Sequence, residues 1–113
     1  MKKKFRLDAS QIRPLVPNAG GCFATDRITV DGAHVGYMYR EPPDDDVDSG
    51  WRFLAGDETQ EYMDDPANLG IYSVNTICNY DPAIIPHLDA PYGSAFSRES
   101  KFGAFIPETF PSE

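Results

Sequence analysis

The chain of 113 residues has no long apolar run. No stretch approaches the roughly 18 consecutive apolar residues of a membrane-spanning helix. An N-terminal export signal needs an apolar run of about 7–15 residues, and Arg6, Asp8, Gln11 and Arg13 interrupt the place where it would lie. We therefore expect a cytoplasmic protein without a membrane span.

Basic side chains are scarce: Lys and Arg number 10 against 18 Asp and Glu, and the formal net charge is -8. Nucleic acids and anionic membranes are bound through clusters of Lys and Arg that contact phosphate. The basic cluster at residues 2–6 lies at the chain end, where a solvated terminus is the simplest interpretation. The composition thus predicts a partner that is neither a nucleic acid nor a membrane.

Cysteine and histidine are rare as well, with two of each. Cys22 and Cys78 lie far apart and lack the spacing of metal ligands, so we predict two reduced, unbonded thiols buried as small apolar residues. His34 and His87 have no Cys, His or Glu at metal-binding spacing. The sequence therefore predicts no metal and no cofactor.

Residues 44–55 match only part of the sequence pattern of a calcium-binding loop. Asp44, Asp46 and Asp48 have the alternate spacing of the first three ligands of such a loop. Ser49 then stands where Gly is required, and Ala55 stands where a bidentate Glu is required. We interpret this stretch as a solvated acidic loop.

Catalytic motifs are also missing. The glycines at 20–21 lack the strand and Lys of a phosphate-binding loop, and residues 93–95 lack the flanks of a nucleophile elbow. Asp57, Glu58 and Glu61 contain a possible acid–base pair, but capping of a following helical turn by Asp57 explains them more simply. We expect no catalytic residues and no enzyme activity.

Length and composition predict one folded domain. A chain of 113 residues has the size of a single domain, and its hydrophobic fraction of 41% and aromatic fraction of 12% are those of a globular protein. We expect a polar lead-in at residues 1–19, an α+β domain at 20–106 and a C-terminal tail at 107–113.

The clearest local pattern is Asp31-Gly32 between two stretches of β-forming residues, 22–30 and 35–40. Asp-Gly in this setting is a strong hairpin signal, so we predict a hairpin that turns there. Further strands are expected at 51–54, 69–72, 92–98 and 102–106, and short helices at 58–63 and 74–80, the second capped by Ser73. This order predicts an α+β fold with a mainly antiparallel sheet.

Acidic charge is concentrated between Asp44 and Asp65, where 22 positions hold nine of the 18 acidic residues and the only Trp. Such a patch repels itself unless a cationic surface meets it, and aromatics among carboxylates are typical of a binding anchor surrounded by steering charge. The predicted partner-binding residues are Asp44, Asp45, Asp46, Asp48, Trp51, Asp57, Glu58, Glu61 and Tyr62.

The role of Trp51 stays open between core residue and binding anchor. Alternate residues of a strand share a face, so Arg52 is expected to project to the face opposite Trp51. There it is predicted to pair with Asp57 or Glu58, an interaction that contributes little where it is exposed.

Several segments together resemble a known family: GYMYRE (36–41), DSGWRF (48–53), GDE (56–58), EYMD (61–64), NLGIY (68–72), NTI (75–77) and NYDP (79–82). They resemble, in this order, a bacterial family first catalogued as a domain of unknown function and later grouped with the immunity proteins of polymorphic toxin systems. The resemblance covers roughly residues 20–98. It implies an α+β cytoplasmic protein that binds and neutralises a toxin delivered by neighbouring cells.

Two functional hypotheses follow. The first is a non-enzymatic binding protein that neutralises a cognate, basic toxin by occupying its active site or substrate groove. The alternative is a small regulatory or ligand-binding domain whose pocket is lined by Tyr37, Tyr39, Trp51 and Tyr62.

Overall fold

Six strands form one sheet in the part of the chain that the computed structural model describes, residues 3–16, 18–100 and 103–110. The strands are β1 (Gly21–Thr25), β2 (Tyr37–Arg40), β3 (Asp48–Leu54), β4 (Leu69–Ser73), β5 (Ala95–Ser97) and β6 (Ile106–Pro107). Their order across the sheet is β4-β1-β3-β2-β5-β6. The pair β1–β3 is parallel, and the other four pairs are antiparallel. The predicted α+β class with a mainly antiparallel sheet is confirmed.

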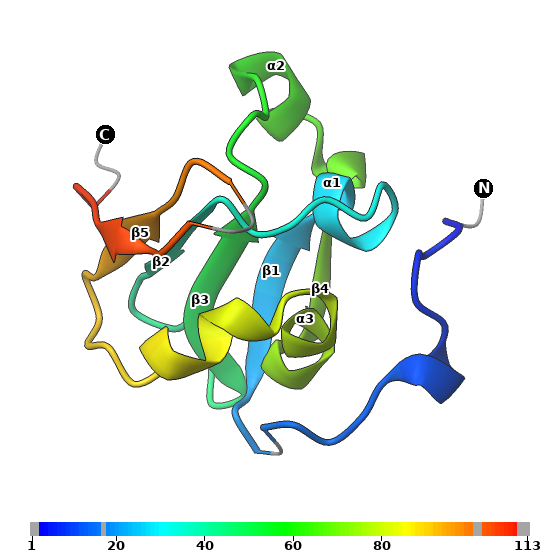
Figure 1. Ribbon diagram of the computed structural model, residues 1–113, viewed down its shortest axis with the longest axis horizontal. Helices are drawn as coiled ribbons and strands as arrows, with labels where there is room; N and C mark the ends of the chain where they lie inside the picture. Colours follow the sequence, from blue (N-terminus) through cyan, green and yellow to red (C-terminus); the bar gives the residue numbers. More distant parts are fainter. Residues whose placement is uncertain (1–2, 17, 101–102, 111–113) are drawn as a thin grey trace.

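Short helices complete the fold: α1 (Asp26–Thr29), α2 (Gln60–Met63), α3 (Val74–Tyr80) and the 3-10 turns η1 (Ala9–Gln11), η2 (Pro66–Asn68) and η3 (Pro82–His87). The helix α3 and the turn η3 lie across one face of the sheet (Figure 1). Both predicted helices are confirmed, and Ser73 caps α3 by accepting the N–H of Thr76 at 3.0 Å. The cap of α2 is Thr59, which accepts the N–H of Tyr62 at 3.0 Å, so the prediction that Asp57 caps this helix was wrong.

The predicted hairpin at Asp31-Gly32 was wrong. After β1 the chain turns into α1, and Gly32 ends that turn: its N–H donates to the carbonyl of Ile28 at 3.1 Å, with φ at +81°. Gly with positive φ suits a helix end as well as a hairpin, and burial of the Ile28 side chain in the core favours the helical turn here. The hairpin that does form joins β2 to β3 through residues 41–47.

The core lies between the sheet and the α3–η3 layer. Trp51 and Phe53 of β3 stack with their ring centroids 6.0 Å apart, and they meet buried side chains from each layer: Cys22, Ala24, Ile28, Val35, Met38, Val74, Ile77, Cys78 and Ile84. Both cysteines are free and buried, as predicted. Burial raises the pKa of the Cys22 thiol and raises that of Cys78 to about 11.

Other expectations concern the chain ends. The strand predicted at 92–98 is confirmed for residues 95–97, which form β5. The strand predicted at 102–106 includes Phe102, which lies outside the described residues; it was wrong for residues 103–105, because the observed strand β6 begins at Ile106. Lys2 of the basic N-terminal cluster also lies outside the described part. Within the described residues, every helix is too short or too polar to cross a membrane.

Candidate functional site

The acidic segment is divided between two ends of the molecule. One group lies in the loop 41–47 and at the start of β3, and the other follows the end of β3 and continues into α2 (Figure 1). A strand of seven residues separates its ends by roughly 20 Å. The nine predicted residues therefore do not form one patch.

A buried ion cluster organises the first group. The guanidinium of Arg52, with a side chain only 6% exposed, donates two hydrogen bonds to the carboxylate of Asp48 at 2.9 Å each and one to Glu41 at 2.6 Å. The prediction that Arg52 pairs with Asp57 or Glu58 was wrong, because Asp48 precedes it by four positions on the same face of β3. The hydrogen bond from Arg52 holds the pKa of Asp48 well below its ordinary value.

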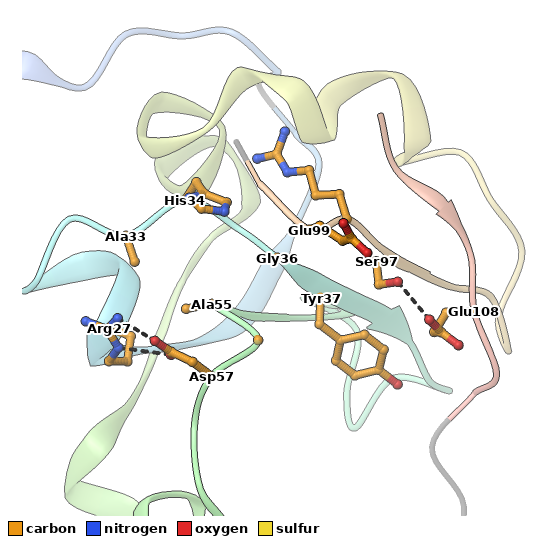
Figure 2. Close-up of a pocket in the computed structure, with 12 residues that line it drawn as sticks. Arg27, Ala33, His34, Gly36, Tyr37, Ala55, Asp57, Ser97, Glu99 and Glu108 are labelled. Atoms are coloured by element: carbon orange, nitrogen blue, oxygen red, sulfur yellow. Dashed lines mark hydrogen bonds and ion pairs between the residues drawn. The ribbon is translucent and has the colours of Figure 1, made fainter. Parts of the chain in front are cut away.

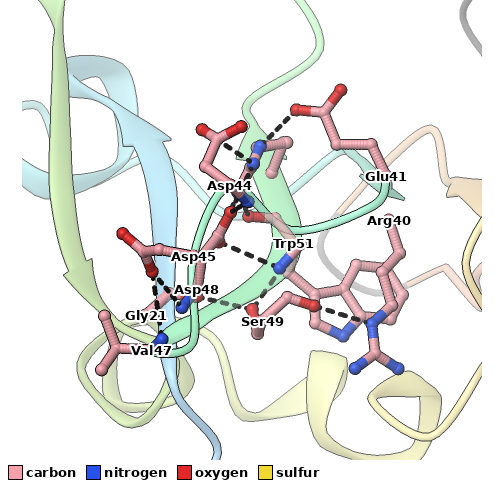
Figure 3. Close-up of polar contacts among 11 residues, drawn as sticks. Gly21, Arg40, Glu41, Asp44, Asp45, Val47, Asp48, Ser49 and Trp51 are labelled. Carbon is pink, nitrogen blue, oxygen red and sulfur yellow. Dashed lines mark hydrogen bonds and ion pairs between the residues drawn. The ribbon is translucent and has the colours of Figure 1, made fainter.

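Two of the predicted aspartates shape the loop itself. Asp48 accepts the N–H groups of Asp44 and Gly50 at 2.9 and 3.0 Å, and Asp45 accepts those of Val47 and Asp48 at 3.0 and 2.9 Å (Figure 3). Gly50 has a φ of +89°, and a Cβ there would clash with the carbonyl of Glu41. These contacts hold the loop against the sheet.

The remaining aspartates of this loop point outward. Asp44 has a side chain 76% exposed, with a carboxylate oxygen 4.0 Å from the Arg52 guanidinium. Asp46 is exposed as well. The loop thus presents carboxylates to solvent on a backbone fixed by internal hydrogen bonds.

The second acidic group is largely bonded within the chain. Asp57 accepts two hydrogen bonds from Arg27, at 2.7 and 3.1 Å, and this contact lowers the pKa of its carboxyl. Glu58 accepts the hydroxyl of Thr25 at 2.6 Å and two backbone N–H groups of the turn before it. Glu61 is exposed on α2, and Tyr62 beside it is half-buried.

Trp51 belongs to the core. It is 1% exposed, and its indole N–H donates to the carbonyl of Leu88 just after η3 at 3.2 Å. Of the two roles considered for Trp51, the structure supports the core residue. Tyr37 and Tyr39 belong to the opposite face of the sheet because they alternate with Met38, whose side chain is buried in the core. The pocket of four aromatics required by the alternative hypothesis is therefore not assembled.

The sequence patterns did not indicate which side chains gather on the sheet face opposite α3 and η3. The pairing register sets one row of side chains across five strands: Ile71, Phe23, Arg52, Tyr39 and Ala95. Arg52 lies over the ring of Phe23, with its Cζ atom 4.6 Å from the ring centroid. At Tyr39 the row is partly covered by Phe110, whose ring packs edge-on against the Tyr39 ring with the two ring centroids 5.7 Å apart. We call this surface the open face.

A separate polar hollow of about 610 Å³ lies between α1, the end of β3 and the end of β5 (Figure 2). Two of its three carboxylates are bonded within the chain, Asp57 to Arg27 and Glu108 to Ser97, both at 2.7 Å. Both carboxylates are thus engaged by groups of the chain itself. Among the described residues, no three His, Cys, Asp or Glu side chains gather in a set that could hold a metal ion.

Comparison with known families supports the resemblance to immunity proteins. The model of the immunity protein Imm33 domain matches residues 22–108, which is most of the chain. No curated protein and no solved structure matches it. The matched residues run from β1 to the end of β6 and so include both acidic groups and the open face. The chain belongs to the Imm33 family of immunity proteins.

Proposed function

We propose that this protein neutralises a cognate toxin by binding it, without catalysis, and that the toxin presents a basic surface. The observation that carries the proposal is the loop 41–47, in which a buried ion cluster holds the backbone while Asp44 and Asp46 face solvent. A loop held in its bound shape loses little conformational entropy on association. The family assignment supports the same role.

The chemistry of the partner follows from the charge. The chain carries a net charge of -8, and a carboxylate-rich loop complements a cleft lined by Lys and Arg, such as that of an enzyme acting on nucleic acid. Complementary charge can speed association to about 10⁸–10⁹ M⁻¹s⁻¹ at low salt. Inhibition would follow from occupation of that cleft.

The nine predicted residues have different parts in this proposal. Asp44, Asp45 and Asp46 meet the toxin, and Glu61 with Tyr62 on α2 is a second, peripheral contact. Four residues act indirectly by holding these surfaces in place: Asp48, Trp51, Asp57 and Glu58. We place the protein in the cytoplasm, which agrees with its two free, buried thiols.

The test measures binding kinetics to the product of the gene adjacent to that of this chain, at low and at moderate salt. The double variant Asp44→Asn, Asp46→Asn is compared with Asp64→Asn, Asp65→Asn, which removes the same charge from exposed positions at the other end of the acidic segment. The first pair should slow association several-fold at low salt and flatten its salt dependence, with little change in dissociation.

Three outcomes contradict parts of the proposal. No complex with the adjacent gene product at either salt concentration would refute toxin binding. Equal effects of the two double variants would show that only net charge matters. Unchanged kinetics for both would move the binding surface away from the acidic segment.

A further inference from the structure

We propose that the toxin docks on the β4 side of the open face, where one Lys or Arg side chain of the toxin enters a hollow between the loop 41–47 and β4. This inference rests on the proposed function and names its binding surface. The hollow measures about 140 Å³, and its lining includes the apolar side chains of Phe23, Val47 and Ile71 and the carboxylates of Asp44, Asp45 and Asp48.

The apolar side of this hollow is unusually exposed. Val47 and Ile71 are 72% and 74% exposed, the highest values among the large hydrophobic side chains of the described residues. They come from different parts of the chain and line the same hollow, and Phe23 pairs directly with Ile71 in the sheet register. Clustered exposed apolar side chains mark an interaction surface, whereas isolated ones need no explanation.

The carboxylate side determines which partner fits. Arg52 is bonded to Asp48 and Glu41 and lies 4.0 Å from Asp44, so three carboxylates share its single positive charge. Asp44 is exposed, and Asp45 uses a single oxygen, Oδ1, for both of its backbone hydrogen bonds. The lining of the hollow therefore combines exposed apolar side chains with a net negative charge.

A Lys or Arg side chain complements both the apolar and the acidic lining residues. Its methylene stem is apolar and its head is cationic, so the stem can lie against Phe23 and Ile71 while the head meets Asp44 and Asp45. The volume of about 140 Å³ suits a single side chain, since small-molecule sites measure roughly 300–1,000 Å³. A second copy of this chain is a poor occupant, because it would bring the same carboxylates to the interface.

The loop wall is held in place before binding. The carbonyl of Val47 accepts the N–H of Gly21 at 2.6 Å, and its N–H donates to Asp45 at 3.0 Å (Figure 3). Val47 is thus tied to the start of β1 although its side chain is exposed. Because this part of the loop is already held in place, little conformational entropy is lost when a partner binds it.

The test compares Ile71→Lys with Ile106→Lys. Both positions are exposed Ile residues on edge strands, at 74% and 57%, and edge strands tolerate Lys. Five strand spacings separate β4 from β6, which is about 24 Å. Net charge changes equally in both variants, so a difference between them reports position alone.

Binding to the adjacent gene product is measured by calorimetry, after circular dichroism has shown that each variant melts as the wild type does. Ile71→Lys should weaken binding about ten- to a hundredfold, as expected for loss of one buried Ile and for occupation of the hollow by the introduced ammonium group. Ile106→Lys should bind within about twofold of the wild type, as expected for a position outside the contact.

Val47→Ser provides a second variant in a loop, where the sheet is not disturbed, and should also weaken binding. If the wild type binds and all three variants bind equally well, the docking surface is refuted while toxin binding stands. If Ile106→Lys weakens binding as much as Ile71→Lys, the β4 side is refuted as the contact. If the wild type forms no complex, the proposed function fails and the docking surface fails with it.

Discussion

Burial should decide how much each of two similar arginines contributes to stability. Arg52 and Arg27 both bond two carboxylates, Asp48 with Glu41 and Asp57 with Asp31. Their side chains differ in exposure, at 6% for Arg52 and 34% for Arg27. Replacing each with Met keeps most of the apolar stem and removes the guanidinium.

Arg52→Met leaves the carboxylate of Asp48, 10% exposed, with backbone N–H groups as its remaining hydrogen-bond donors. Breaking a buried pair costs about 3–5 kcal/mol, and those remaining bonds together with the partial exposure of Glu41 favour the lower end, about 3 kcal/mol. Arg27→Met breaks an exposed, solvent-screened pair and should cost about 0.2–1 kcal/mol.

The measurement is urea unfolding of the two variants and the wild type, with thermal unfolding as a second readout. Arg52→Met should lower the melting temperature by about 10 °C or more, and Arg27→Met by about 4 °C at most. Adding Asp48→Asn to Arg52→Met should restore part of the loss, because no unpaired charge then remains buried. Equal costs for the two arginines, or no restoration, would refute the argument from burial.

Three further predictions concern the pH dependence of stability, a second buried arginine and the two thiols. The pKa of Asp48 is lowered in the folded protein. The ionised carboxylate therefore contributes its full stability above the unfolded pKa of roughly 3.9, and this contribution is lost as the pH falls below that value. Between pH 5 and 2, the free energy of unfolding should fall less steeply in Asp48→Asn than in the wild type. Arg98→Met should destabilise the fold by about 3 kcal/mol in urea unfolding, because it removes the cationic partner of the buried carboxylate of Asp81 and leaves it the backbone N–H groups of Val35 and Ala83. Cys22 and Cys78, buried and with raised pKa values, should resist a thiol reagent in the native protein, and both should react after denaturation without reductant; a single reactive thiol, or none, would contradict this.

Short-range chemistry explains which structural predictions were correct. Ser73 and the apolar spacing of Val74, Ile77 and Cys78 predicted α3, because a cap and an i, i+3, i+4 face depend on neighbours within one turn. The hairpin predicted at Asp31-Gly32 was wrong because a hairpin turn and a helix end both accept Gly with positive φ, and the local sequence does not distinguish them. Burial of Ile28 beneath the helical turn decided between them, and that contact is made by distant residues.

In the candidate site, too, some features depend on local sequence and others on contacts between distant residues. The sequence alone indicated a chain rich in exposed carboxylates and poor in cationic surface, because solvation of Asp and Glu depends little on distant residues. It could not indicate that Asp57 and Glu58 are used internally, since their partners Arg27 and Thr25 are 30 and 33 positions away and are brought near only by folding.

The sequence by itself determined the α+β class, the helix capped by Ser73 and the surplus of negative charge, since each depends on composition or on residues a few positions apart. Only the tertiary structure decided that β1 pairs in parallel with β3, which brings Phe23 beside Arg52. It also brought Val47 and Ile71 to one hollow, although 24 positions separate them in the chain. Strand order and the choice of face depend on the packing of the whole core, because a shift of one residue in register moves every side chain of a strand to the other face.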